Sequence, residues 1–455
     1  MAKRINLLEG NITSALTKLA LPIMGMSFIQ MAYNLTDIFW IGKIGPGSVA
    51  AVGTGGLIIW FCTGLHMITQ LGGQVYVAQN LGARDTNRAA DFAKSALFLS
   101  AILSLILGFI FLYFTNPVVS FFRLNDPAVI SGAKIYIKIT GGLIIFQLLT
   151  KMLTTLITTT GNSKTPFLAT SIGLIFNMIL DPLLIFGFLG FPKLGIFGAA
   201  IATVLAQVIV FSILFIYCLR DKHLFGMIKW TSLPNLDYCK RIIKLSLPVT
   251  IQATLFPLIS MIISRLVAGY GDNAVAVQRI GSQIESISWM TSEGFAVAVN
   301  SFIAQNTGAN NIKRARRGYY HALTILSIWG ALSTLILIFG AKPLFSVFLD
   351  DPTVVIMGKE YLIILGISQL FMCWEILSSN AMNAFGKTTL PAAISITFTG
   401  LRIPMALALS ASILALNGIW WSITISSILK GIFLLLSVVL YLRKIYKSTY
   451  TNNPI

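Results

Sequence analysis

The stretch LALPIMGMSFIQMAYNLTDIFWI, residues 19–41, carries no charge except on Asp37. A helix needs about 20 apolar residues to cross the hydrocarbon core of a bilayer, so this stretch is long enough to span a membrane. Apolar stretches of similar length recur along the whole chain. The sequence therefore predicts an all-α polytopic membrane protein, in which one span contains an acid with no lysine or arginine close to it in the sequence.

The overall composition agrees with this prediction. Of the 455 residues, 56% are hydrophobic and 11% are charged, whereas about 25% of the residues of a soluble domain are charged. No part of the chain between the apolar stretches is long enough for a separate soluble domain. We predict twelve transmembrane helices, at residues 15–41, 48–76, 95–115, 137–158, 167–190, 195–219, 244–268, 281–303, 319–341, 361–384, 391–414 and 419–442.

The positive charges predict the orientation in the membrane. The net charge of +18 would suggest nucleic-acid binding in a soluble protein, but most of the lysines and arginines fall in loops on one side of the predicted spans. The opposite side has only Lys43, Arg123, Lys134, Lys193, Arg279, Lys342 and Lys359. Since cytoplasmic loops are enriched in Lys and Arg, we expect both termini in the cytoplasm, contact with anionic lipid headgroups, and no nucleic acid.

Neither a disulfide framework nor a zinc site is predicted. Cys62, Cys218, Cys239 and Cys373 are far apart in the sequence, and no Cys/His spacing typical of a metal site occurs. Catalytic motifs such as HExxH and GxSxG are also missing from the sequence. We therefore predict neither an enzyme nor an organic cofactor.

An internal repeat organises the chain. KLALP (18–22) recurs as KLSLP (244–248), and AQNLGA (78–83) recurs as AQNTGA (304–309) at the same offset. At a slightly smaller offset, GNSKTP (161–166) aligns with GKTTLP (386–391). The repeat predicts two six-helix lobes in the same orientation, an arrangement that lets transporters expose a central cavity to alternate sides. We place the first lobe at 1–220, a basic cytoplasmic linker at 221–243 and the second lobe at 244–455.

The repeat also shows which polar residues the fold itself does not require. In the second lobe, apolar or basic residues stand where the first lobe has its two acids and an amide. The aligned pairs are Asp37 and Ile263, Asn177 and Arg402, Asp181 and Ala406, and Thr203 and Ser426. We therefore interpret the two acids as functional groups of the first lobe alone.

Helical spacing groups these side chains into one candidate site. Asn177 and Asp181 are four residues apart on the fifth span, and Gln30, Tyr33 and Asp37 follow one another at intervals of three and four on the first, so each set shares a helical face. A charge at mid-bilayer costs about 3 kcal/mol on insertion scales. Two carboxyl groups lower that cost by binding protons or by holding a sodium ion, a hard cation that favours oxygen ligands.

Structural roles for the same residues remain open alternatives at this point. Asp37 would pair with a distant lysine, such as Lys151 on the fourth span. Asn177 would make only an interhelical hydrogen bond, and Thr203 would only pack against its neighbours.

These features together resemble the multidrug and toxic compound extrusion (MATE) family of transporters. The resemblance rests on the duplicated plan, on NLTDIFWIG (34–42), on the two AQNxGA segments, on FNMILDP (176–182) and on the two GxxxxP turns, and it covers nearly the whole chain. It implies the export of bulky, often cationic or amphipathic organic compounds in exchange for H⁺ or Na⁺.

The resemblance also assigns roles to particular residues. The DinF-like branch of the family builds a first-lobe cation site from an Asp on the first helix, an Asn and an Asp on the fifth, and a Thr on the sixth. Asp37, Asn177, Asp181 and Thr203 would accordingly hold the proton or Na⁺. Supporting residues would be Gln30 and Tyr33, at matching intervals before Asp37, and Pro22, which matches a proline-linked bend of the first helix.

The second lobe departs from the NorM-like branch, whose members have acids on the seventh and tenth helices. Here the seventh span has Arg265 and no acid, and Glu375 on the tenth lies about one helical turn from the NorM position. Glu285 and Glu293 lie on the eighth span. We interpret the three acids as partners of buried cations in neutralising ion pairs, with a second coupling or substrate site as the alternative. The cations are Arg265, Arg402 and Lys430.

The predicted function is secondary antiport by alternating access in the cell membrane. The expected partners are a small organic compound as substrate, H⁺ or Na⁺ as coupling ion, and membrane lipids, and we expect a monomer. The alternative is a flippase for lipid-linked glycans, which shares this broad superfamily architecture. Its anionic pyrophosphate headgroup would demand a cationic cavity, for which the candidates are Lys138, Lys151, Arg265 and Arg402.

Overall fold

The computed structural model describes residues 4–122, 124, 126–230, 232–348 and 351–451. The regular elements of this part of the chain are helices. The first half contains α1 (Ile12–Gly42), α2 (Pro46–Gly82), α3 (Thr86–Tyr113), α4 (Thr115–Ser120), α5 (Pro127–Thr140), α6 (Ile144–Thr159), α7 (Lys164–Phe186) and α8 (Ile196–Arg220), with the short turns η1 (Phe188–Gly190) and η2 (Phe225–Met227). The second half contains α9 (Leu236–Ala268), α10 (Asp272–Gly308), α11 (Ile312–Phe339), α12 (Ala341–Ser346), α13 (Pro352–Gly366), α14 (Gln369–Ala384), α15 (Thr389–Gly400), α16 (Arg402–Ser410) and α17 (Ala415–Thr451).

The helix boundaries repeat with the same offsets as the sequence. The shift that relates AQNLGA to AQNTGA carries the bounds of α2, α3 and α4 onto those of α10, α11 and α12. The shift that relates GNSKTP to GKTTLP carries the bounds of α6 onto those of α14. Backbone details repeat too, because both of these turns begin with a glycine at positive φ, 88° at Gly161 and 75° at Gly386. These left-handed conformations suit glycine, which has no Cβ.

Most of the predicted spans are helices long and apolar enough to cross a membrane. Among the described residues, nine helical spans meet that test when α15 and α16 are counted as one span, and two bent pairs raise the number to eleven. The pairs are α5 with α6, bent by 50°, and α13 with α14, bent by 45°. The one remaining predicted span, 281–303, lies in α10, which has 37 residues but is less apolar because it carries many polar side chains, Glu285 and Glu293 among them.

The contacts between residues divide the chain into two compact units. The first unit contains Gly25–Thr250 with the segment before Asn6, and the second contains Asn6–Met24 with the chain from Ile251 onward. Helices α1 and α9 therefore each begin in one unit and end in the other. The predicted lobes follow the sequence repeat instead, so they differ from these units at the first half of α1 and the first half of α9.

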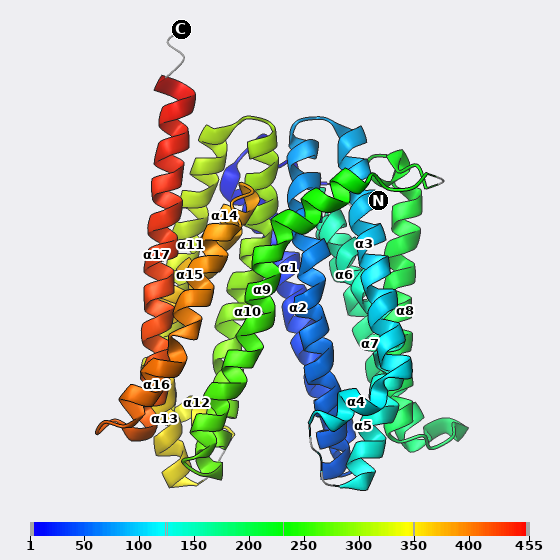
Figure 1. Cartoon of the computed structure of the whole chain (residues 1–455), viewed down its shortest axis with the longest axis vertical. Coiled ribbons are helices and arrows are strands. Elements are labelled where there is room, and N and C mark those ends of the chain that lie inside the picture. The colour runs from blue at the N-terminus through cyan, green and yellow to red at the C-terminus, as the bar shows by residue number, and fades with distance from the viewer. Residues whose placement is uncertain (1–3, 123, 125, 231, 349–350, 452–455) are drawn as a thin grey trace. The chain divides into compact units, whose positions relative to one another are not determined.

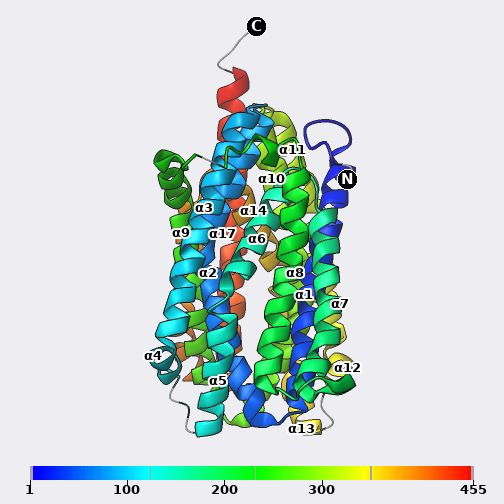
Figure 2. The ribbon, with the colours of Figure 1, turned by 90° about the vertical axis from the view of Figure 1, so that its right-hand side faces the viewer.

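The first unit is a bundle of long helices around several apolar cores. Helix α2 packs on α3, α5 and α6, while α8 packs on α5, α6 and α7, and the long helices lie nearly parallel (Figures 1 and 2). One core contains Val77, Phe92 and Leu156, and the other contains Phe111 and Ile137.

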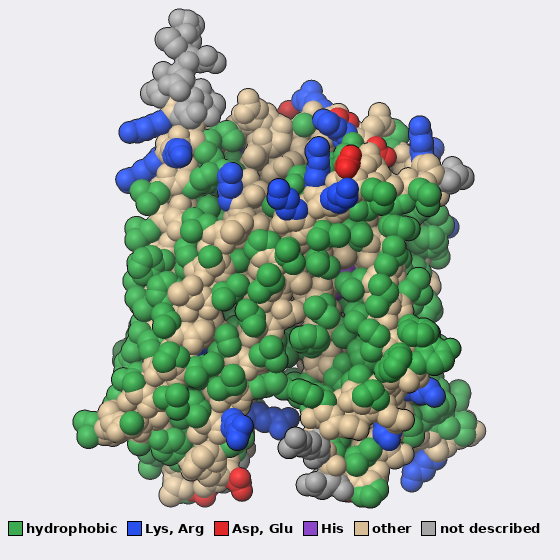
Figure 3. All heavy atoms as spheres, in the orientation of Figure 1, with side chains coloured by type: hydrophobic (Ala, Val, Ile, Leu, Met, Phe, Trp, Pro, Cys, Tyr) green, Lys and Arg blue, Asp and Glu red, His purple; other side chains and the backbone are tan. Residues whose placement is uncertain are grey.

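The second unit is built in the same way. Helix α14 packs on α10, α11 and α17, and one core contains Phe345, Tyr361 and Trp420, with the ring centroids of Tyr361 and Trp420 5.1 Å apart. On the face shown in Figure 3, hydrophobic side chains cover the middle of the helices of each unit, and Lys and Arg gather mainly near one end. Arg123, predicted on the opposite side, lies outside the described residues.

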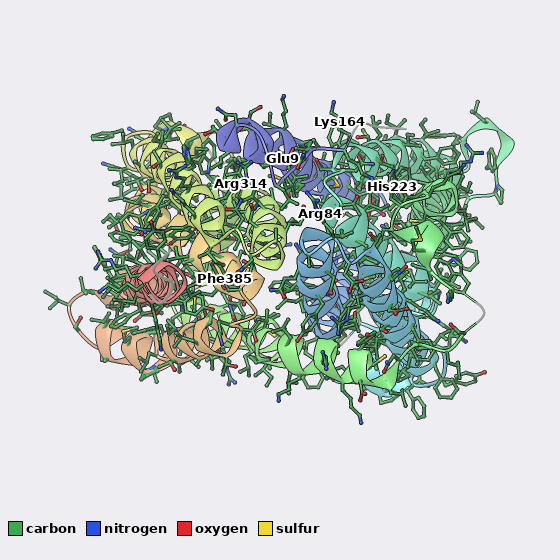
Figure 4. The ribbon with its side chains drawn as sticks, turned by 90° about the horizontal axis from the view of Figure 1, so that it is seen from above. Glu9, Arg84, Lys164, His223, Arg314 and Phe385 are labelled. Carbon is green, nitrogen blue, oxygen red and sulfur yellow. The ribbon has the colours of Figure 1, made fainter. Side chains whose placement is uncertain are left out.

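The segment before α1 is anchored at the basic end of the helices. In the second unit the Arg314 guanidinium donates to the carbonyls of Leu7 (3.2 Å), Glu9 (2.8 Å) and Gly10 (2.9 Å), and Figure 4 shows Arg314 beside Glu9. Asn306 of the AQNTGA segment donates to the Leu7 carbonyl at 3.1 Å. The second copy of the repeated motif thus binds the backbone of the segment before α1, whereas Asn80 of the first copy donates to the Tyr76 carbonyl of its own helix at 2.7 Å.

Candidate functional site

The cation-site residues predicted on the fifth span lie on α7, inside the first unit. Asn177 and Asp181 are both buried. They are one turn apart, and the Asn177 Nδ2 atom donates to the Asp181 Oδ1 atom at 3.3 Å. The amide therefore orients one oxygen of the carboxyl group and leaves the other free to bind a ligand.

Helix α1 brings Asp37 to the same place. The carboxyl groups of Asp37 and Asp181 lie within hydrogen-bonding reach of each other. Nearby, the ends of α1 and α7 pack through Trp40 and Phe186, whose ring centroids are 6.1 Å apart, and through Ile41 and Ile185. The structure thus brings together two acids that are far apart in the sequence.

Several oxygen atoms of this cluster are buried without a hydrogen-bond partner. Among the described residues they are Asp37 Oδ1, Asp181 Oδ2 and Asn177 Oδ1. Buried polar atoms are nearly always paired, and an unpaired buried group is costly. Three such oxygens around two carboxyl groups fit a proton shared between the acids, and they also fit a small hard cation such as Na⁺.

Hydroxyl groups stand next to the acids. The phenols of Tyr33 on α1 and Tyr136 on α5 both lie close to the Thr203 side chain on α8. Both also lie within electrostatic range of Asp37 and Asp181. Tyr136 was not among the predicted site residues. It aligns with Tyr361 at the offset that relates GNSKTP to GKTTLP, and in the structure Tyr361 also lies beside an acid, Glu285.

Two predicted supporting residues lie elsewhere in the structure. The Gln30 side chain is exposed and donates to Asn34 at 3.3 Å, so it does not join the cluster of acids. Pro22 lies inside α1, in the half of the helix that belongs to the second unit.

The alternative ion pair between Asp37 and Lys151 is not present. The Lys151 Nζ atom donates to the Thr63 hydroxyl at 3.2 Å, and among the described residues the ion pairs at hydrogen-bonding distance do not include Lys151. The charge on Asp37 is therefore not neutralised by that lysine.

The second unit has an apolar cluster at the corresponding position. Ile263 and Ala406, the counterparts of Asp37 and Asp181, are buried in one cluster with Val267, Ala274 and Ile419. The same backbone framework therefore packs without any carboxyl group there. The acids of the first unit are not demanded by the fold.

The predicted ion pairs of the second unit are present in part. Glu375 pairs with Lys430 at 2.8 Å, and both side chains are largely buried. The Arg402 guanidinium donates to hydroxyl groups instead, to Ser426 at 2.6 Å and to Ser427 at 3.0 Å. In the repeat, Ser426 aligns with Thr203 and Arg402 aligns with Asn177. In the second unit, the two residues at these positions are therefore in contact.

Neutral groups lie next to the two remaining acids of α10, and the charge of Arg402 also acts on Glu285. Glu285 accepts from the Tyr361 hydroxyl at 2.9 Å and from the Gln369 amide at 3.2 Å. Glu293 is exposed and lies close to Asn380. The prediction that Arg265 is a buried partner of these acids is wrong, because its side chain is exposed; its place near the end of α9 lets it point away from the core.

The comparisons with known proteins decide the family. A family model, MatE, matches residues 22–183 and 248–408, which together are more than half of the chain and fall in the two halves of the repeat. The protein is a member of the MATE family.

Relatives and solved structures of MATE proteins cover almost the whole chain. NorM of Thermotoga maritima, described as a probable multidrug resistance protein, is 27% identical over 413 residues, or 90% of this chain and 88% of that protein. The FAD transporter of Shewanella oneidensis is 26% identical over 440 residues, or 95% of each chain. A crystal structure of a MATE in the bent conformation matches with a TM-score of 0.90 at 22% identity, covering 98% of this chain and 99% of that one.

The structural likeness confirms the predicted fold class of twelve helices in two lobes. The MATE protein described here is thus a multi-pass membrane protein. The relatives do not distinguish the branches of the family, so the DinF-like assignment stays a prediction.

Proposed function

We propose that this MATE protein is a secondary antiporter that exports organic compounds in exchange for H⁺ or Na⁺. The observation that carries the proposal is the pair of carboxyl groups, Asp37 and Asp181, that face each other in the first unit and keep unpaired oxygens. Family membership supports the transport class, and the relatives described as multidrug resistance proteins support the substrate class.

The coupling ion acts by neutralising the two acids. Asp37 and Asp181 take up H⁺ or Na⁺ in the outward-facing state, with Asn177 orienting Asp181 and Thr203 and Tyr33 supplying neutral oxygens. Binding removes the repulsion between the two carboxylates and changes the packing of α1 against α7. The exported compound leaves in response, and the loaded carrier turns inward, where the ion is released. Reciprocal linkage requires each ligand to weaken the binding of the other.

The proposal extends to the state and the surroundings of the protein in the membrane. It acts as a monomer in the cell membrane with both termini in the cytoplasm, where the basic ends of the helices contact anionic lipids. Pro22, which lacks a backbone N–H, provides a point at which α1 bends during the cycle.

The hypothesis of a lipid-linked glycan flippase is not favoured. Family membership points to MATE transporters, and of the four candidate cations, Lys138 and Arg265 are exposed and Arg402 is bound by serine hydroxyls.

Efflux from proteoliposomes tests the coupling. We expect the purified protein to drive efflux of a cationic dye under a pH gradient alone or a sodium gradient alone, whichever ion it uses. Asp37→Asn removes one ionisable group while preserving its size, so gradient-driven efflux should fall to the level of protein-free vesicles.

Asp126→Asn is the matched control. Asp126 caps α5 by accepting from the Ala128 N–H at 2.8 Å, and Asn caps a helix about equally well, so efflux should be retained. Full efflux by Asp37→Asn under both gradients would overturn the assignment of Asp37.

A further inference from the structure

The first unit contains a second buried ionisable cluster, which the coupling ion does not explain. Lys151 on α6 points toward α2, where its Nζ atom donates to Thr63 at 3.2 Å. His66 lies on the same face of α2 and is bound to Ser100 on α3, at 2.7 Å from its Nε2 atom. These groups form a polar connection between α2, α3 and α6 in the middle of apolar helices.

The lysine of this cluster has no acid beside it among the described residues. No acid among the described residues acts on Lys151, whose own charge reaches the neighbouring His66 ring, and the observed ion pairs use other residues. An ionisable residue inside a membrane span faces a partner or a substrate pathway as a rule. Here the described residues supply hydroxyl, amide and imidazole groups and no acid, which leaves room for a negatively charged partner that is not one of these residues.

The cluster has donors left for such a partner. An ammonium group has three N–H donors, and Lys151 uses one on Thr63. Gln70 donates one amide hydrogen to Thr155 at 2.8 Å and has a second. Lys151, Thr63 and Gln70 are all partly exposed, whereas His66 is fully buried, so the lysine side of the cluster is the accessible one.

The repeat indicates that the fold does not need this lysine. Thr63, His66, Gln70 and Lys151 correspond to Trp289, Ser292, Ala296 and Ile376 in the second half of the chain. The corresponding helices α10 and α14 also pack against each other, although they lack the polar cluster. The polar cluster is therefore a particular feature of the first unit, as the pair of acids is.

We propose that Lys151 binds a carboxylate group of the transported compound. The inference rests on the proposed function and specifies that its organic substrates include compounds with a carboxylate group, either zwitterions or anions. The ammonium group of Lys151 and the second amide hydrogen of Gln70 donate to the carboxylate, which supplies the negative charge that the described residues do not provide beside Lys151.

Two dyes of one scaffold test the inference. A rhodamine with a free carboxylate and its ethyl ester differ only in the anionic group. In proteoliposomes, Lys151→Met should reduce efflux of the carboxylate dye by about tenfold or more, the amount expected for the loss of a charge-assisted hydrogen bond. Efflux of the ester should stay unchanged, and Lys151→Arg should retain efflux of both dyes because it keeps the charge.

Lys138→Met is the matched control, since it removes an exposed lysine from the same unit and should alter neither dye. An equal loss of both dyes in Lys151→Met would show a structural role of the lysine, and no change in either dye would show that substrate does not reach it. Either result overturns the inference, as does an effect of Lys151→Met on both dyes that disappears when chloride is replaced by gluconate.

Equilibrium binding separates this inference from the proposed function. Fluorescence anisotropy of the two dyes on the purified protein needs no gradient and no transport. Selective weakening of carboxylate-dye binding in Lys151→Met and in a second variant, Lys151→Gln, supports the inference even if the wild-type protein exports neither dye, a result that would overturn the proposed function alone. Equal affinity of wild type and both variants for the carboxylate dye would overturn the inference while leaving the antiport proposal standing.

Discussion

Asp37 and Ile263 show how single residues turn a shared framework into a site. They occupy corresponding positions of the repeat, yet Asp37 faces a second carboxyl group whereas Ile263 is buried in an apolar cluster at 3% exposure. An isolated acid in a membrane span is unfavourable, and two of them in contact are more so unless an ion neutralises them. The first unit therefore accepts a local energetic cost that the second unit avoids.

A reciprocal exchange of these residues tests this difference. Ile263→Asp places an unpartnered acid in the apolar cluster and should destabilise the protein by about 2.5–3.5 kcal/mol. Asp37→Ile removes an unfavourable acid and should leave the thermal unfolding temperature in detergent equal or higher, while abolishing coupled efflux. Thermal unfolding monitored by size-exclusion chromatography measures both effects. Equal destabilisation by the two substitutions would mean that Asp37 has a structural role.

At the scale of helices, the two halves differ in the continuity of one helix, and a proline explains the difference. Helix α7 runs unbroken past Pro182, whereas its counterpart is divided into α15 and α16, and Arg402 begins α16. Pro404 cannot donate to the carbonyl of Gly400, and its ring crowds that carbonyl. The break follows at that point, and it places the buried Arg402 side chain against Ser426 and Ser427.

The N-terminal cap of α13 gives a pH-dependent prediction at this scale. Asp351 accepts from the Thr353 hydroxyl at 2.6 Å and from the Thr353 N–H at 2.9 Å, and these hydrogen bonds lower the pKa of its carboxyl group. A group with a lowered pKa stabilises the fold above its unfolded pKa, and that contribution is lost as the pH falls through the native value.

We therefore expect the first turn of α13 to lose protection in acid. Hydrogen exchange of peptides covering Pro352–Gly358, corrected for the intrinsic pH dependence of exchange, should show faster opening below the ordinary carboxyl range. Asp351→Asn caps the helix without ionising, so its protection should not vary with pH in that window. A pH-independent opening rate in the wild-type protein would contradict the prediction.

At the scale of the whole chain, duplication explains both the regularity of the fold and the asymmetry of its chemistry. Helix bounds repeat at the offsets of the sequence motifs, and the AQNxGA segments stand at the same turn of each half. The acids of the first unit, its Lys151 cluster and the Glu375–Lys430 pair of the second unit do not repeat. Each half has kept the scaffold and acquired its own polar groups.

The orientation of the chain is testable with introduced cysteines. Cys62, Cys218, Cys239 and Cys373 are buried, so labelling of the wild-type protein by a membrane-impermeant maleimide should be low. Lys193→Cys and Lys222→Cys replace exposed residues that we predict on opposite sides of the membrane. In intact cells the reagent should label Lys193→Cys, and it should label Lys222→Cys only after the membrane is opened. The reverse pattern would mean that the termini lie outside the cell.

Much of the architecture was predictable because it depends on local properties of the chain. The length of an apolar stretch determines whether a helix spans the membrane, and the repeated motifs give the relation between the halves without any structure. Asn177 and Asp181 were predicted to share a face from their spacing alone, and they do. The span in α10 was predicted from the length of its apolar stretch, although its polar residues make it the least apolar of the twelve.

Which polar groups meet across helices was decided only by the tertiary structure. Tyr136 stands near Thr203, Glu375 pairs with Lys430 and not with an arginine, Gln30 turns to Asn34, and Arg265 is exposed. Sequence spacing gives the face of a helix that a residue occupies, but the rotation of that helix about its axis follows from how whole bundles pack. A buried charge then binds whichever partner the packing brings within a hydrogen-bond length, and that choice is not encoded in either helix alone.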